Sequence, residues 1–313
     1  MNILERKHLL AELDELNRLI DQMPKSDVID RMSLEARKEE VGAALAAAPV
    51  PNREPVRARL TFRGTPIIGS HGMFAEFGAK AINAFADAVA AIGASRTSAL
   101  GMRGALPNRE TYQLLITGTA LGSFGFELEE APKEEGLFPE ESPVANAIEQ
   151  TRSIMEASLG TDDELTEAIA ETDPRAVDAL RGFLKTLSDQ EAVCALEFKE
   201  EVFRFANIGQ VRRSEARLNQ DNIHEEDTQL SGQFLGVLPK RRTFEFQVAD
   251  TQEIITGNVG ADIEDAAIIN HVLESPLTIQ VRTKRAGTGR PKYTLLSYEQ
   301  SESPQTVEQT DGE

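Results

Sequence analysis

Residues 231–298 read SGQFLGVLPKRRTFEFQVADTQEIITGNVGADIEDAAIINHVLESPLTIQVRTKRAGTGRPKYTLLSY. This stretch contains apolar or alternating runs that are typical of β-strands, separated by turn residues. The runs are Gly232–Leu238, Thr243–Val248, Glu253–Val259, Leu277–Val281 and Tyr293–Tyr298. Between the third and fourth runs, Asp262–Leu273 has apolar residues at near-helical spacing, with Asp262 as a candidate N-cap. The stretch therefore predicts three strands, a short helix and two more strands.

This order resembles the OB fold, a small five-stranded barrel whose ligand-binding loops join strands one to two and four to five. The resemblance concerns strand order alone and covers about a fifth of the chain. The two corresponding loops hold all but one of the basic residues of the stretch: Lys240, Arg241 and Arg242 in the first, and Lys284, Arg285, Arg290 and Lys292 in the second.

Basic loops of this kind supply sequence-independent affinity for a phosphate backbone, so these seven residues are the candidate nucleic-acid-binding residues. The alternative explanation is that loops are charged because they are solvated, and that Lys and Arg protect open strand edges from pairing. Few side chains are available to stack on bases, because the chain has no Trp and only three Tyr, and the candidates in the stretch are Phe234, Tyr293 and Tyr298.

The composition limits the classes of function. A formal net charge of −19 argues against a protein that coats nucleic acid with its whole surface. No apolar run is long enough to span a membrane, and the N-terminus lacks the apolar region of a signal peptide. Cys194 is the only cysteine, so no intrachain disulfide can form. We therefore expect a cytoplasmic protein without membrane contact, in which Cys194 is a buried, inert thiol.

Residues 1–50 predict a helical hairpin. Its first helix has apolar residues at the spacing of a coiled-coil seam: Leu9, Leu13, Leu16 and Ile20. The second helix carries a sparser apolar stripe of Leu34, Val41 and Leu45. A short connection between two such helices predicts an antiparallel pair. Residues 3–47 then either bind a protein partner or a second copy, or pack on their own domain.

Residues 51–131 predict an α+β unit of two strands, a helix over Phe74–Ile92 and two further strands, with Leu114, Ile116, Phe124 and Phe126 directed inward. Ser70, His71 and Gly72 precede the helix. Backbone N–H groups at a helix N-terminus can hold an anion, which makes these three residues a possible anion site. Ser70 acting simply as the N-cap explains the same pattern.

The remaining segments complete an α+β, multi-domain prediction. Residues 132–143 read as an acidic linker, residues 144–220 as a helical region with a β-hairpin, and residues 221–230 as a second linker into the OB-like barrel at 231–299. Residues 300–313 are acidic and without basic residues, which predicts a disordered tail.

No motif in the sequence specifies a reaction. The four histidines have no metal-ligand neighbours at motif spacing, so we predict no catalytic residue, no metal and no cofactor. We predict a non-enzymatic accessory factor of a bacterial-type cytoplasmic complex, whose barrel contacts nucleic acid. The alternatives are a scaffold or oligomerisation subunit without nucleic-acid contact, and a carboxylate-metal nuclease or other enzyme.

Overall fold

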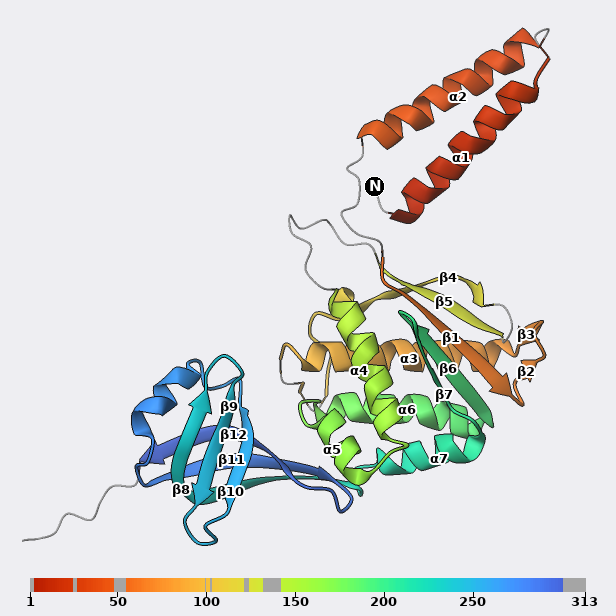
Figure 1. The fold of residues 1–313 in the computed structure, drawn as a ribbon. Coiled ribbons are helices and arrows are strands. Elements are labelled where there is room, and N and C mark those ends of the chain that lie inside the picture. The colour runs from red at the N-terminus through yellow and green to blue at the C-terminus, as the bar shows by residue number, and fades with distance from the viewer. Residues whose placement is uncertain are drawn as a thin grey trace, which may run out of the picture.

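The computed structural model describes residues 3–24, 27–47, 55–98, 100–101, 103–120, 124–131 and 142–300. The protein is a mixed α+β structure with an N-terminal helical hairpin, an antiparallel sheet packed against helices, and a C-terminal sheet that closes on itself (Figure 1). Most of the predicted acidic linker and tail lies outside the described residues. Within those residues, each helix is too short or too polar to cross a bilayer.

Helices α1 (Ile3–Gln22) and α2 (Val28–Ala47) form the hairpin. The apolar residues predicted from the sequence pack between them: Leu16, Val41 and Leu45 are buried, and Leu9, Leu13 and Leu34 pack around them. Arg37 of α2 donates a hydrogen bond of 2.8 Å to Glu12 of α1. The apolar stripes of the two helices therefore pack against each other within one chain.

Strand β1 (Arg57–Gly64) is the centre of a five-stranded antiparallel sheet with the order β4-β5-β1-β6-β7. The other strands are β4 (Leu114–Ala120), β5 (Phe124–Glu130), β6 (Ala192–Phe198) and β7 (Glu201–Arg204). One face of β1 buries Leu60 and Phe62. On the opposite face, Arg59 forms ion pairs with Glu127 of β5 and Glu197 of β6. The alternation of the sequence therefore separates a core face from a charged face.

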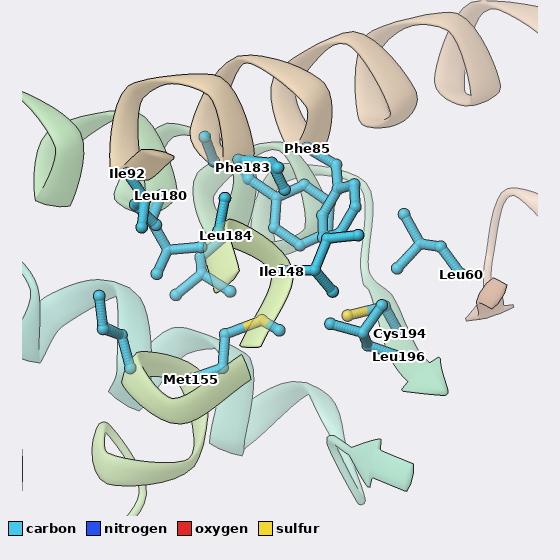
Figure 2. Packing of buried hydrophobic residues seen from close by; sticks show 14 of the residues in the cluster. Leu60, Phe85, Ile92, Ile148, Met155, Leu180, Phe183, Leu184, Cys194 and Leu196 are labelled. Carbon is cyan, nitrogen blue, oxygen red and sulfur yellow. The ribbon is translucent and has the colours of Figure 1, made fainter. Parts of the chain in front are cut away.

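The sheet joins two regions that the sequence separates. β1 belongs to the predicted unit 51–131, whereas β6 belongs to the predicted region 144–220, and the two strands pair along their length. A single buried core runs through both regions and includes Leu60, Phe85, Phe183, Cys194 and Leu196 (Figure 2). Neither region therefore has a core of its own. The two strands are far apart in the sequence, so no local sequence pattern predicts that they pair.

Helices α3 (Ala75–Ser95), α4 (Pro143–Ala157) and α6 (Pro174–Asp189) pack on the apolar face of this sheet, together with the shorter α5 (Asp162–Ile169) and α7 (Ile208–Arg217). The rings of Phe85 and Phe183 join α3 to α6 with centroids 5.4 Å apart. Cys194 is buried on β6, and this burial raises the pKa of its thiol to about 12. Such a thiol carries no nucleophilic thiolate near neutral pH.

Two short elements precede and follow α3. Strands β2 (Ile67–Ile68) and β3 (Gly72–Met73) form a small hairpin, and the 3₁₀ helix η1 (Arg109–Tyr112) leads into β4. The β4–β5 register shifts between Ile116 and Gly118. Ile116 pairs with the buried Leu128 of β5 but is itself 55% exposed, so the expectation that it belongs to the core is wrong. β4 is an edge strand of the sheet, and the apolar pattern does not reveal which strand lies at the edge.

The C-terminal part closes into a barrel with the ring order β10-β12-β11-β8-β9. Its strands are β8 (Ile223–Leu238), β9 (Thr243–Val248), β10 (Ile254–Val259), β11 (Leu277–Ala286) and β12 (Lys292–Gln300), and the 3₁₀ helix η2 (Ala266–Val272) lies between β10 and β11. Aromatic and aliphatic side chains fill the interior, among them Phe234, Phe244, Phe246, Ile279 and Leu295. The sequence pattern located each of these strands, although not all of their ends.

Residues 221–230, predicted as a linker, contribute the first half of β8. Residues 223–230 pair with residues 279–286 of β11. This arm is held by ion pairs across the two strands, Glu225 with Lys284 at 3.1 Å and Asp227 with Arg282 at 2.7 Å. A strand that is stabilised by charges rather than by burial has no apolar period, which is why the sequence reads as a linker.

Candidate nucleic-acid interface

The first basic loop, residues 239–242, joins β8 to β9. Lys240 and Arg241 are exposed, and neither has a hydrogen-bond or ion-pair partner among the described residues. Arg242 differs from them. Its guanidinium donates hydrogen bonds to three backbone carbonyls, those of Val259 at 3.3 Å, Gly260 at 2.6 Å and Ile263 at 2.7 Å. Arg242 therefore fixes the chain between β10 and η2, whereas Lys240 and Arg241 are available to a ligand.

The turn of the second basic loop, residues 287–291, is attached to the start of α5. The backbone N–H of Thr288 donates to Asp162 Oδ2 at 3.0 Å, and that of Arg290 donates to Asp163 Oδ1 at 2.7 Å. Gly287 has a φ of +52°, and a Cβ at this position would collide with the carboxylate of Asp162. A glycine is therefore required both by the turn and by the close approach.

The carboxylate of Asp162 is stabilised in its charged form. The backbone hydrogen bond from Thr288 is the largest cause, followed by the hydrogen bond from Arg217, and together they hold the pKa of Asp162 below its ordinary value. Arg217 reaches Asp162 Oδ1 at 2.8 Å from the end of α7. One carboxylate thus ties together α5, α7 and the second loop.

Besides Arg242, two more of the predicted binding residues are occupied by contacts within the chain. Lys284 lies on β11 and is buried, where it donates to the carbonyl of Thr172 at 2.8 Å and pairs with Glu225. Lys292 is the first residue of β12 and pairs with Glu167 of α5. Both residues hold the barrel against the helices. Arg285 and Arg290 are exposed, and their side chains have no partner in the part of the chain that the structure describes.

An open cleft of about 570 Å³ lies between the barrel and the helices. Thr243, which follows the first loop, and Lys292, which ends the second, both line it. The two basic loops therefore border the same cleft. The other lining residues are mainly polar and come from the end of α3, from α4, from α5 and the segment after it, and from β10 and β12: Ser95, Arg96, Gln150, Ser153, Glu167, Ala168, Ala170, Glu171, Thr172, Thr256, Gly257, Asn258, Tyr293 and Thr294.

Of the three candidate stacking residues, the structure places one in the cleft. Phe234 is fully buried in the barrel core, and Tyr298 packs against it with ring centroids 6.1 Å apart. Tyr293 is half-buried and lines the cleft, and this burial raises its pKa. Arg96, at the C-cap of α3, is an exposed cation in the same lining, and nothing in the sequence around it indicates this position.

Ser70, His71 and Gly72 lie at the turn of the β2–β3 hairpin rather than at a helix N-terminus. The helix α3 begins at Ala75 with Phe74 as its N-cap, so the expectation that Ser70 is the cap is wrong. The backbone N–H of Phe74 donates to the carbonyl of Pro66 at 3.0 Å, which keeps the chain in the hairpin up to that residue. The prediction of an anion site depended on a helix N-terminus at these residues, and the helix begins further along the chain.

The described residues contain no group of three or more His, Cys, Asp or Glu side chains placed to hold a metal ion. Comparisons of the chain with known protein families, with curated proteins and with solved structures find no match.

Proposed function

We propose that this protein is a non-enzymatic accessory factor of a cytoplasmic complex, and that its barrel is of the OB type and binds single-stranded nucleic acid. In chain order the barrel strands are one to five, and their ring order is one, two, three, five, four. Strands three and five, β10 and β12, pair in parallel, and η2 lies between strands three and four. This arrangement supports the OB assignment, in which the two basic loops are the ligand-binding loops.

The observation that carries the proposal is the cleft that both loops border. Four exposed cations lie outside the lining of the cleft and have no side-chain partner among the described residues: Lys240 and Arg241 on the first loop, Arg285 near the end of β11, and Arg290 on the second loop. Their charges suit a sugar–phosphate backbone. Tyr293 lines the cleft and packs at the edge of the barrel core, and an aromatic residue in this position suits stacking with an unpaired base, which favours a single strand over a duplex.

The lining of the cleft contains two glutamates. Glu167 is paired with Lys292, whereas Glu171 accepts a hydrogen bond of 2.7 Å from the neutral amide of Asn258 and keeps its charge. One of the two negative charges in the lining is therefore neutralised. Most of the repulsion from the rest of the surface is screened beyond about 10 Å at 0.1 M salt.

The test is fluorescence anisotropy with the full-length chain and a labelled homopolymer of about 16 nucleotides, titrated between about 50 and 200 mM salt. The logarithm of the association constant should fall linearly with the logarithm of salt concentration, because each neutralised phosphate releases counterion. The double variant Lys240→Gln/Arg241→Gln should reduce the slope by about 1.4, since each phosphate contact on a single strand contributes about 0.7.

The matched control is Arg204→Gln/Arg213→Gln, which removes the same charge from exposed residues of β7 and α7. Its salt slope should equal that of the unmodified protein. If the control loses as much affinity as the loop variant, binding is a non-specific response to charge and the cleft is not the site. A folded protein that shows no binding even at about 50 mM salt would overturn the proposal and favour the scaffold alternative.

A further inference from the structure

The ion pair between Lys292 and Glu167 lies in the cleft itself. Both residues line the cleft, Lys292 from the barrel strand β12 and Glu167 from helix α5. The pair is open to solvent, since the side chain of Lys292 is 44% exposed and that of Glu167 is 70% exposed. The barrel is therefore joined to the helices, within the proposed binding cleft, by a contact that water reaches.

This ion pair differs from the other contacts between α5 and the second loop. Asp162 and Asp163 accept hydrogen bonds from backbone N–H groups of the turn, and these bonds fix the position of the loop. Glu167 instead engages a lysine ammonium, a group that binds phosphate as well as carboxylate. Among these three carboxylates, only Glu167 engages a cation of the barrel.

Lys292 is also placed where a bound strand would meet it. Among the described residues, the lining of the cleft holds two basic side chains, Arg96 and Lys292. The four exposed cations of the loops lie outside the lining. A phosphate group inside the cleft therefore has Lys292 as one of its two nearest cationic partners.

We propose that Glu167 is an internal competitor of the nucleic-acid strand, and that a phosphate group of the strand displaces it from Lys292. The exchange, which rests on the proposed nucleic-acid binding, makes Lys292 a binding cation in addition to the four exposed ones. The released carboxylate of Glu167 turns to water. Glu167 therefore lowers the affinity of the unmodified protein for a phosphate backbone.

The magnitudes favour the exchange at low salt. An exposed ion pair contributes at most about a factor of five to an equilibrium constant. A phosphate contact on a single strand contributes about 0.7 to the salt slope, which is about eightfold in affinity at about 50 mM salt. The gain from the phosphate contact therefore exceeds the loss of the ion pair.

The barrel stays attached to the helices when Lys292 changes its partner. The backbone N–H of Ala286 donates to Oγ1 of the buried Thr166 at 2.8 Å. The buried Lys284 donates to the carbonyl of Thr172 at 2.8 Å. These contacts are shielded from solvent and do not involve Glu167, so the exchange requires only that two exposed side chains move.

The test is fluorescence anisotropy of the full-length chain with a labelled oligothymidine of about 16 nucleotides at about 50 mM salt. Glu167→Gln keeps the shape of the side chain and removes its charge, and should raise the affinity between about twofold and fivefold. Lys292→Gln should lower the affinity and reduce the salt slope by about 0.7. In Lys292→Gln/Glu167→Gln most of the gain from Glu167→Gln should disappear, because that gain depends on Lys292.

The matched control is Glu76→Gln, because Glu76 and Lys80 form an exposed Glu–Lys ion pair on α3. Residue 76 is about 30 Å along the helix from Arg96 in the cleft, so this variant should leave the affinity unchanged. An equal gain in Glu76→Gln, or a gain that persists in full without Lys292, would overturn the exchange. If the unmodified protein binds but Glu167→Gln binds no more tightly, the exchange alone fails. If neither binds, the proposed function fails as well.

Zero-length cross-linking reads the exchange directly. A water-soluble carbodiimide joins a lysine amine to a carboxylate that it contacts, and mass spectrometry of the peptides identifies the Lys292–Glu167 link. Saturating oligothymidine should reduce the yield of this link and leave that of the Lys80–Glu76 link unchanged. An undiminished Lys292–Glu167 link in the saturated complex would overturn the exchange.

Discussion

The attachment of the second loop to α5 predicts a large local effect for Asp162→Ala. This change removes the acceptor for the backbone N–H and the hydroxyl of Thr288, at 3.0 and 3.2 Å, and for Arg217 at 2.8 Å. Hydrogen bonds to a charged group contribute about 1.5–3 kcal/mol each. The side chain of Asp162 is 34% exposed, so water replaces part of this loss, and we expect about 2–4 kcal/mol in all.

The assay is hydrogen exchange of the amides in residues 286–290, read by mass spectrometry. Asp162→Ala should accelerate their exchange by at least about tenfold, since about 1.4 kcal/mol corresponds to a factor of ten. Asp162→Asn retains one acceptor oxygen and should have a smaller effect. Unchanged exchange at these amides in Asp162→Ala would refute the attachment of the loop to α5.

The same contact predicts a pH dependence. The folded-state pKa of Asp162 is lowered, so its stabilising contribution is fully present above the ordinary carboxyl pKa and is lost as the pH falls through the lower folded value. The difference in melting temperature between the unmodified protein and Asp162→Ala should be constant from about pH 5 to 8 and should shrink below about pH 4. A difference that grows on acidification would contradict this account.

Two further predictions distinguish residues that stabilise the fold or are buried in it from residues that are exposed to solvent. Arg242→Ala should destabilise the barrel by about 1–3 kcal/mol, because three backbone carbonyls lose their donor, whereas Lys240→Ala should stay within about 0.5 kcal/mol. Thermal unfolding followed by circular dichroism distinguishes them, and equal melting temperatures would contradict the role of Arg242. The Cys194 thiol should not react with a disulfide reagent at about pH 8 until denaturant is added, because its pKa is raised to about 12. Stoichiometric labelling of the native protein would contradict its burial.

Local patterns in the sequence located the elements whose stability comes from local burial. The alternation in Thr243–Val248 and the heptad spacing of Leu9 to Ile20 each correspond to an element of the structure. The pairing of β1 with β6 has no local signal, because the partners are more than a hundred residues apart. The polar half of β8 was missed because its stability comes from ion pairs to β11.

The candidate site was also predictable only in part. The basic residues of the two loops can be read from the sequence, but the residues with which they pair cannot. In the sequence, Lys284 and Lys292 look like Lys240, since each is a basic residue in or beside a predicted loop. In the structure, however, Lys284 forms an ion pair with Glu225 and Lys292 forms one with Glu167, and both glutamates are distant in the sequence. The glycines at 287 and 289 read as an ordinary turn. Their requirement becomes clear only when Asp162 and Thr166 lie against them.

In the proposed complex a single strand lies in the cleft between the two loops, with a base against Tyr293. Ultraviolet cross-linking of an oligothymidine to the full-length protein, followed by mass spectrometry of the peptides, tests this position directly. We expect a cross-link at Tyr293 that disappears in Tyr293→Leu while the cleft and its loops remain folded. Cross-links confined to the hairpin of α1 and α2 or to the five-stranded sheet, with none at Tyr293, would contradict it.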